Sequence, residues 1–228
     1  MNCNFCHITI NGQYYRDIWG TVYCERHESE AGVQHCDCCR SLIVPGSYPA
    51  SKKLRDGRIV CGNCLFDFVD NMQKLNNAYK YVVSVYNKAK VYLPLDRINL
   101  TLCNEGEIHS SSCSYPVGQT RSLISPFSKN RYCIDILSAN YTYAVDTLAH
   151  ELMHVVQNEL NLLLNKQHSE GLCECAAYLV LQTIKSDVAK RLNKGKERSM
   201  DTIYGEGFRL VKAEIIRVGS LQAYLSRL

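Results

Sequence analysis

The chain has 228 residues, of which 46% are hydrophobic and 21% are charged, and its formal net charge is +4. This composition is typical of a globular protein and excludes a largely disordered chain. The weak positive charge does not indicate a general nucleic-acid partner. No apolar run approaches the roughly 18 residues of a membrane span, so we expect neither nucleic acid nor a membrane among the partners.

Thirteen cysteines are the unusual feature of the composition. Eight of them precede residue 65, and the first residues, MNCNFCHITI, have neither the basic start nor the apolar segment of a signal peptide. In the reducing interior of a cell, so many cysteines indicate metal binding and not disulfides. We therefore expect a cytoplasmic protein whose N-terminal region binds metal.

Residues 1–65 alternate short strand-like segments with turns, as in ITINGQYY, WGTVYC and RDGRIVCGNC. The Asn11-Gly12 and Asp56-Gly57 pairs predict hairpin turns. From about residue 66 to residue 89, apolar residues recur at intervals of three and four, which predicts a helix. The pattern indicates a small domain over residues 1–68 and a connecting helix over residues 69–90.

The second domain is expected over residues 91–228. Strand-like segments fall within residues 91–136, and two long helices are predicted over Thr142–Leu164 and Ser169–Lys185. The stretch KSDVAKRLNKGKERS is interpreted as a solvated basic connector, and a helical pattern resumes near Gly207. The expected fold class is α+β, with a two-zinc β-hairpin module followed by a larger domain.

Four pairs of possible zinc ligands share a gap of two residues: Cys3/Cys6, Cys24/His27, Cys36/Cys39 and Cys61/Cys64. Two ligands at this spacing grip one face of a tetrahedral ion, and a second pair completes the site. The connecting segments have 17 and 21 residues, which favours sequential pairing. This predicts a Cys₃His site followed by a Cys₄ site. In the alternative, crossed arrangement, the first and third pairs bind one ion. Residues beside the ligands that could be mistaken for them are His7, His35 and Cys38.

The segment AHELMHVVQ, residues 149–157, carries a third candidate site. His150 and His154 are four residues apart, so both imidazoles leave one face of a helix and can bind one ion. Glu151 lies beside that face, where it can act as a base toward a water molecule. The alternative is a helix that carries two solvated or buried histidines without a metal.

A catalytic zinc needs a third protein ligand, and the acidic residues within reach are Glu159, Glu170 and Glu174. Glu159 is on the same helix and should point away from the metal. Glu170 and Glu174 share one face of the next predicted helix, with Ser169 as its cap, so spacing alone admits either. Gly171 would let the chain pass close to the metal, which favours Glu170, and Glu174 would then accept the other ring N–H of a ligand histidine.

The first 65 residues resemble a LIM domain, with the Trp19-Gly20 pair before the third ligand adding to the likeness. Two differences are that the third and fourth ligands run Cys then His, and that eight residues separate the two units. The segment EGLCEC resembles the motif that supplies the third ligand in gluzincin peptidases, which implies that Glu170 is that ligand. LIM domains bind proteins, so this resemblance implies a partner or regulatory role for the module.

Taken together, LAHELMHVVQ, SEGLCECAAYLVL and IYGEGFRLVKAEIIRVGSLQAYLSRL resemble the peptidase domain of the LIM-containing, ubiquitin-activated peptidases that limit organ size in plants. The resemblance implies a zinc metallopeptidase that cleaves protein substrates, with a link to ubiquitin or ubiquitin ligases. We expect three zinc ions per chain, one catalytic and two structural. Tyr204 is a candidate donor to the oxyanion, or else a packing residue. The alternative function is a non-catalytic, zinc-stabilised adaptor.

Overall fold

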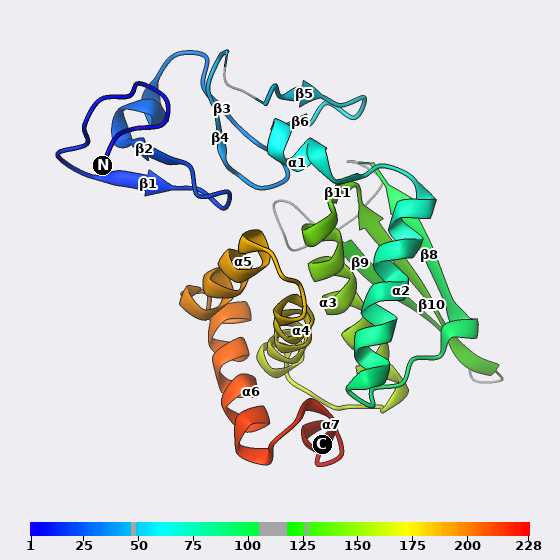
Figure 1. Ribbon diagram of the computed structural model, residues 1–228. Helices are drawn as coiled ribbons and strands as arrows, with labels where there is room; N and C mark the ends of the chain where they lie inside the picture. The colour runs from blue at the N-terminus through cyan, green and yellow to red at the C-terminus, as the bar shows by residue number, and fades with distance from the viewer. Residues whose placement is uncertain (47–48, 105–117, 126–127) are drawn as a thin grey trace. The chain divides into compact units, whose positions relative to one another are not determined.

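The structure is a computed structural model that describes residues 1–46, 49–104, 118–125 and 128–228 (Figure 1). The chain divides into two compact units, Met1–Phe68 and Val69–Leu228. We call them the cysteine module and the helical unit. The fold is mixed α+β, and no helix in the described part of the chain is long and apolar enough to cross a membrane.

The cysteine module is built from three short antiparallel hairpins. A 3-10 helix, η1 (Glu25–Ser29), follows the first hairpin, and α1 (Gly62–Phe66) follows the third. Each helix begins directly after a cysteine, Cys24 or Cys61, and contains the residue that completes the pair, His27 or Cys64. The strands are β1 (Tyr14–Arg16), β2 (Val22–Cys24), β3 (Gln34–His35), β4 (Leu42–Ile43), β5 (Lys52–Lys53) and β6 (Ile59–Val60).

One of the two predicted turns forms a hairpin and the other does not. Asp56-Gly57 lies in the turn between β5 and β6, where Gly57 has a φ of 95°. Asn11-Gly12 connects no pair of named strands. The first hairpin turns instead at Asp17, whose carboxylate accepts hydrogen bonds from the backbone N–H groups of Trp19 (2.9 Å) and Thr21 (2.8 Å). An aspartate that binds its own backbone in this way organises a turn without the Asn-Gly pair.

The helical unit contains a three-stranded sheet with the order β8–β10–β9. The strands are β8 (Ile98–Cys103), β9 (Gly118–Ser125) and β10 (Ser128–Leu137), and β10 runs parallel to β8 and antiparallel to β9. Tyr132, Ile134 and Ile136 of β10 are fully buried on one face, as the alternation of a half-buried strand requires. Of the strand-like region 91–136, residues 105–117 and 126–127 lie outside the described residues.

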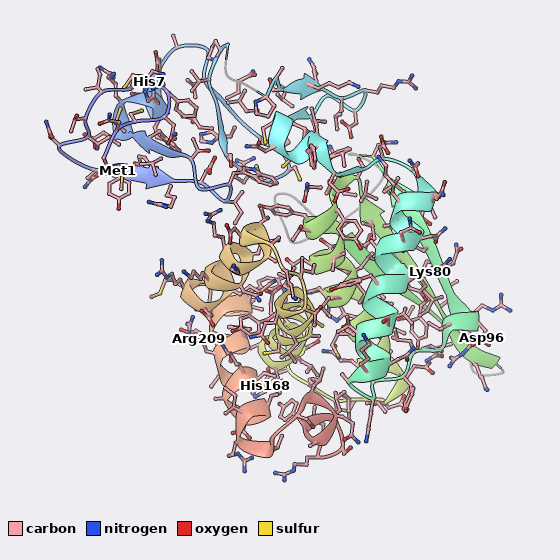
Figure 2. The ribbon with its side chains drawn as sticks, in the orientation of Figure 1. Met1, His7, Lys80, Asp96, His168 and Arg209 are labelled. Carbon is pink, nitrogen blue, oxygen red and sulfur yellow. The ribbon has the colours of Figure 1, made fainter. Side chains whose placement is uncertain are left out.

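Helix α3 (Tyr141–Glu159) is the centre of the helical unit, because it contacts the sheet, α2 (Met72–Lys88) and α4 (Lys166–Gln182). Helices α5 (Asp187–Arg198) and α6 (Tyr204–Val218) pack on α4, and α7 (Leu221–Leu225) packs on α6. Side chains fill the space between these helices, whereas Lys80 on α2 projects outward (Figure 2). The remaining elements are the 3-10 helix η2 (Leu95–Arg97) and the two-residue strands β7 (Phe68–Val69) and β11 (Ala139–Asn140).

The predicted connecting helix is part of the core and not a linker. Leu75, Ala78, Val82 and Tyr86 of α2 are buried in the main apolar cluster of the helical unit. The Tyr86 hydroxyl also donates a hydrogen bond to the backbone carbonyl of Ala149, one residue before His150. The amphipathic pattern that predicted the helix therefore marks a face that packs against α3.

Three helix boundaries differ from the sequence prediction because other residues act as caps. Helix α3 ends at Glu159, and α4 begins at Lys166, since the Asn165 side chain accepts a hydrogen bond from the backbone N–H of His168 (2.9 Å). The Ser169 cap is therefore wrong. The basic stretch expected to be a connector is α5, which Ser186 caps by accepting from Ala189 N–H (3.1 Å).

Gly171 marks a close approach of α4 and α6. A Cβ atom at Gly171 would lie 2.3 Å from the backbone carbonyl of Gly207, and one at Gly207 would lie 2.2 Å from the carbonyl oxygen of Gln167. These distances are below any ordinary contact, so two helices meet at two glycines. Gly171 therefore allows α6 to pack closely on α4. This role differs from the one expected from the sequence, in which the glycine lets its own chain approach a metal.

We expect Gly171→Ala to destabilise the helical unit although alanine favours helix. Overpacking typically costs about 1–3 kcal/mol, which exceeds the propensity gain of about 1 kcal/mol. Gly195→Ala is the matched control, because Gly195 is also helical and an added Cβ would meet nothing within 4 Å. It should raise the free energy of unfolding by about 0.5–1 kcal/mol. Thermal or denaturant unfolding measures the stability of both variants. Equal changes in the free energy of unfolding would contradict the close contact between Gly171 and Gly207.

Candidate metal centres

The first cluster joins Cys3, Cys6, Cys24 and His27, whose ligand atoms all lie within 4.8 Å of one another. The Nε2 atom of His27 is buried and has no hydrogen-bond partner among the described residues, whereas Nδ1 pairs with the carboxylate of Glu30. A buried ring nitrogen without a partner is costly unless a metal binds it. Glu30 then fixes the tautomer that leaves Nε2 free for the ion. This arrangement fits zinc, and the sequence reasoning did not identify Glu30.

The second cluster joins Cys36, Cys39, Cys61 and Cys64, all of them buried. The Sγ atoms of Cys36 and Cys64 are 3.9 Å apart, and those of Cys39 and Cys61 are 3.7 Å apart. Two sulfurs on one tetrahedral zinc lie about 3.8 Å apart, given a zinc–sulfur bond of about 2.3 Å. A disulfide would require about 2 Å. The spacing therefore fits a shared zinc ion.

Backbone N–H groups support the thiolate form of the ligands in both clusters. Phe5 N–H lies 3.4 Å from Cys3 Sγ, and Cys61 N–H lies 3.2 Å from Cys36 Sγ. Burial opposes ionisation of Cys3, but backbone N–H donors outweigh it and lower the pKa of the thiol to about 6. The neighbouring thiols lower the pKa of Cys36 and raise those of Cys61 and Cys64, so the four thiols of the second cluster share their protons. Because thiolate is the metal-binding form, the backbone N–H contacts favour a bound cation.

The pairing is sequential, and the crossed arrangement is not the one that forms. The residues that could have been mistaken for ligands belong to neither cluster: His7, His35 and Cys38. His35 instead contacts the Arg40 carbonyl through Nδ1 (3.1 Å) and Glu28 through Nε2 (3.4 Å). The equal two-residue gaps therefore identified all eight residues that the structure brings together in two clusters compatible with zinc.

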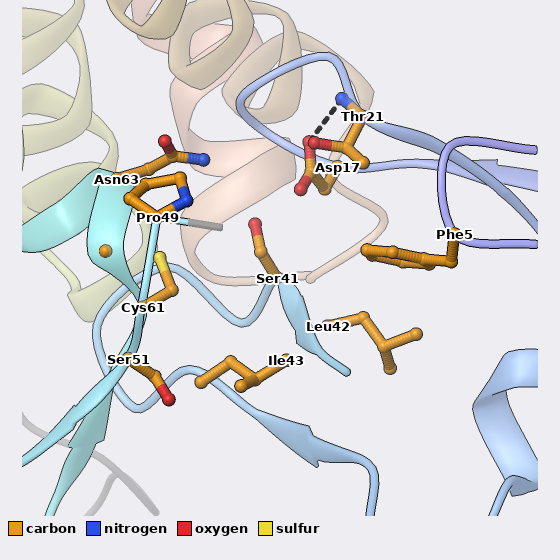
Figure 3. A pocket seen from close by; sticks show the side chains of 11 residues that line it. Phe5, Asp17, Thr21, Ser41, Leu42, Ile43, Pro49, Ser51, Cys61 and Asn63 are labelled. Carbon is orange, nitrogen blue, oxygen red and sulfur yellow. Dashed lines mark hydrogen bonds between the residues drawn. The ribbon is translucent and has the colours of Figure 1, made fainter. Parts of the chain in front are cut away.

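Trp19 connects the two halves of the cysteine module. Its indole Nε1–H donates to the Sγ atom of Cys39 at 3.2 Å, so a side chain from the first hairpin contacts a ligand of the second cluster. A small pocket of about 80 Å³ lies in the same module (Figure 3). Asp17 and Thr21 approach it from the first hairpin, and Ser41 and Leu42 approach it from the second. Its size suits a few water molecules and not a peptide segment.

We expect His27→Ala to release the zinc of the first cluster to a chelator that the wild type resists. The variant keeps the three cysteine ligands but loses the fourth ligand and its contact with Glu30, so its affinity for zinc falls. His35→Ala is the control, since His35 neighbours a ligand but coordinates nothing. Elemental analysis after chelator dialysis should show one zinc fewer in the first variant alone. An unchanged zinc content in His27→Ala would contradict the assignment.

The third candidate centre lies where α4 passes α3 in the helical unit. The Oε2 atom of Glu170 is 3.2 Å from Nε2 of His150 and 3.6 Å from Nε2 of His154. Two nitrogen or oxygen ligands of one tetrahedral zinc lie about 3.3 Å apart, given bonds of about 2.0–2.1 Å. Glu170 Oε2 therefore lies near the spacing of a shared zinc ligand from each of the two imidazoles.

Cys173 is a second possible third ligand that the sequence reasoning did not consider. Ligand atoms of Cys173, His150 and His154 lie within 4.8 Å of one another. However, its Sγ atom contacts Nδ1 of His154 (3.4 Å), on the other side of the ring from the nitrogen that faces Glu170. Burial raises the pKa of Cys173 to about 11. We therefore favour Glu170.

The charges of the third centre favour a cation between the imidazoles. Burial disfavours the charged form of His150, but Glu170 and Glu174 outweigh it and raise its pKa to about 10. Burial likewise opposes a charge on His154, and Cys173 and Glu170 raise its pKa to about 10. Burial would raise the pKa of Glu170, yet the two histidines lower it far below its usual range. A metal ion can replace the protons that this cluster attracts.

The Nδ1 atoms of both candidate ligand histidines have partners that fix the rings. Glu174 Oε1 lies 3.0 Å from His150 Nδ1. Gln157 Oε1 lies 3.2 Å from His154 Nδ1, and the Ser169 hydroxyl donates to the same oxygen (2.8 Å). Ser169, expected as a helix cap, thus orients a ligand partner instead. Such contacts hold Nε2 toward the metal.

Glu151 is buried beside this centre, with 7% of its surface exposed. The Thr120 hydroxyl on β9 donates to Glu151 Oε2 at 2.7 Å, which holds one carboxylate oxygen and leaves the other for a water molecule. No sequence signal identified Thr120, because its pairing with α3 depends on how the sheet packs. A Cβ at Gly118 would lie 3.2 Å from Cγ of Glu151, so the strand passes close to this side chain.

Tyr204 begins α6 near the third centre. Its ring centroid lies 6.4 Å from that of His150, and Tyr204 lines a pocket of about 300 Å³ together with Asp146 and Glu174. The glycines that follow it, Gly205 and Gly207, are helical and do not form a turn. Glu159, the other acidic candidate, pairs with Arg97 and Tyr132 away from the histidines, as expected from its position on the helix.

Comparison of the chain with protein-family models, with curated proteins and with solved structures gives no significant match. The functional interpretation therefore depends on the residues and their geometry.

We expect three alanine variants to show which residue is the third ligand. Glu170→Ala should release the zinc of the helical unit at ordinary concentrations, whereas Glu174→Ala should weaken it by about 10–100-fold. Cys173→Ala should keep it, because the thiol is not a ligand. Zinc titration against a competing chelator gives the ranking, with the two zinc ions of the cysteine module as an internal reference. If Cys173→Ala is the only variant that loses the zinc, Cys173 and not Glu170 is the third ligand.

Proposed function

We propose that this protein is a zinc metallopeptidase of the HExxH…E type, with two further, structural zinc ions in the cysteine module. The observation that carries the proposal is the position of Glu170 Oε2, at 3.2 Å and 3.6 Å from the Nε2 atoms of His150 and His154. Three protein ligands leave the fourth position of a tetrahedral ion open, which distinguishes catalytic from structural zinc sites. Zinc bound there supplies a Lewis acid that lowers the pKa of water and polarises a carbonyl group.

Glu151 is the proposed general base. Its neighbouring position on the ligand helix and its contact with Thr120 orient one carboxylate oxygen and leave the second for a proton. Glu151 takes a proton from the attacking water and later delivers it to the leaving amine nitrogen, so one water is consumed per bond cleaved. Tyr204 is proposed as a donor to the oxyanion, supported by its distance of 6.4 Å from the His150 ring.

The cysteine module is proposed to be LIM-like and to bind a partner or regulate cleavage. Two zinc clusters and the Trp19–Cys39 contact support a rigid module with a fixed outer surface. The resemblance to the LIM-containing peptidases of plants supports intracellular protein substrates and a link to ubiquitin or to ubiquitin ligases. The alternative is an adaptor without activity. A buried Glu151 beside an open ligand position favours the peptidase, because a structural zinc site needs no base.

We expect Glu151→Gln to keep the fold and all three zinc ions while it lowers peptidase activity by about 10²–10⁴-fold, the usual contribution of a positioned acid–base group. The measurement compares new protein N-termini in cells that express the wild type or the variant. It is paired with elemental analysis of the purified proteins.

Glu159→Gln is the matched control, since it makes the same chemical change further along the same helix, where Glu159 pairs with Arg97. It should retain activity. If no N-terminus distinguishes the wild type from Glu151→Gln although both hold three zinc ions, the adaptor is the better description. If Glu151→Gln loses the third zinc, Glu151 is a ligand and not a base.

A further inference from the structure

Lys196 on α5 is an almost buried lysine in a basic segment. Its side chain is 11% exposed, whereas that of Lys190 on the same helix is 70% exposed and pairs only with Asp187. Long ammonium side chains rarely become buried unless they have charged partners. The sequence interpretation of this segment as a solvated basic stretch therefore does not hold for Lys196.

The Lys196 ammonium joins two carboxylates from two other helices. Its Nζ atom lies 2.6 Å from Glu174 Oε2 on α4 and 3.1 Å from Asp146 Oδ1 on α3. Both carboxylate side chains are themselves mostly buried, with 17% and 19% exposed. The three helices α3, α4 and α5 thus meet at one ammonium group.

This contact continues to the third metal centre through Glu174. Oε2 of Glu174 is held by Lys196, and Oε1 faces Nδ1 of His150 at 3.0 Å. The carboxylate therefore has no rotational freedom without breaking one of the two contacts. Lys196, Glu174 and His150 form a continuous chain of charged groups that ends at a proposed zinc ligand.

Without the ammonium, two carboxylates would share a poorly solvated site. Like charges in a low-dielectric environment repel, so Glu174, no longer held through Oε2, turns toward solvent. Its Oε1 atom then no longer accepts a hydrogen bond from His150 Nδ1–H. A ligand imidazole that loses this acceptor is less basic and less well oriented, and metal affinity falls.

We propose that Lys196 is a positioning residue for the third zinc centre, because it holds the Glu174 carboxylate against His150 Nδ1. This inference rests on the proposed zinc site at His150, His154 and Glu170. It adds a residue from α5, a segment whose sequence carries no metal-binding motif.

The docking of α5 has other contacts, so Lys196 can be changed without losing the helix. Asn193 Nδ2 donates to the Tyr178 carbonyl on α4 at 3.1 Å. Glu197 accepts hydrogen bonds from Lys212 (2.7 Å) and from the Tyr178 hydroxyl (2.8 Å). Substitutions at Lys196 therefore test the ammonium group and not the presence of α5.

The test compares the affinity of the third zinc in wild type, Lys196→Met and Lys196→Arg, with Lys190→Met as control. Zinc is titrated against a competing chelator in the full chain, and circular dichroism monitors helix content. Lys196→Met keeps most of the side-chain length without the charge. We expect it to weaken the third zinc about tenfold or more, with the two zinc ions of the cysteine module retained. Lys196→Arg should recover part of the loss, and Lys190→Met should have no effect.

Wild-type affinity in a folded Lys196→Met variant would overturn the positioning role while leaving the proposed peptidase intact. Equal losses in Lys196→Met and Lys196→Arg would also overturn it, since the charge would then not matter. If Lys196→Met does not fold, the double variant Asp146→Asn with Lys196→Met removes the repulsion between the carboxylates. It still lacks the ammonium that holds Glu174 Oε2, so a weakened third zinc is still expected. A wild-type chain with no third zinc would overturn the proposed function and this inference together.

Discussion

The helical unit must accommodate charged groups inside an apolar core, and this constraint explains much of its arrangement. His150, His154, Glu170 and Glu174 project between α3 and α4, whose other facing residues include Leu148, Leu152, Leu172 and Ala176. A buried charge is tolerated only when a partner of opposite charge or a metal ion balances it. Each of these charged groups has such a partner. The cluster forms because α3 and α4 carry their charged residues on the sides that face each other.

The same requirement extends outward from the cluster. Glu174 needs Lys196, and Lys196 in turn lies against Asp146, so α5 is drawn into the environment of α3 and α4. On the other side, Gln157 and Ser169 satisfy His154 with neutral hydrogen bonds and introduce no further charge. The two histidines are therefore supported differently, one by a charged chain and the other by an amide and a hydroxyl. This difference gives His150 the stronger electrostatic link to the surrounding helices.

The cysteine module meets a different constraint, because 68 residues with two- and three-residue strands bury little apolar surface. A chain of this size commonly requires disulfides or metal ions for a stable fold. Four thiols spaced for tetrahedral zinc, and a buried His27 nitrogen with no partner among the described residues, fit a module that zinc stabilises. Metal binding and folding of the module would then be one process. The helical unit has an apolar core of its own.

Local sequence determined the features that depend on short spacing. Equal two-residue gaps identified the eight residues that cluster in the cysteine module, and the interval of four residues placed His150 and His154 on one face of a helix. Both patterns are set by backbone geometry within a few residues. The sequence also favoured Glu170, but only the tertiary structure brought Cys173 to the other side of the His154 ring. Thr120 beside Glu151 and Lys196 behind Glu174 likewise depend on how separate helices and strands pack, and no interval in the sequence encodes those contacts. The same holds for Gly171, whose neighbour is the backbone of another helix.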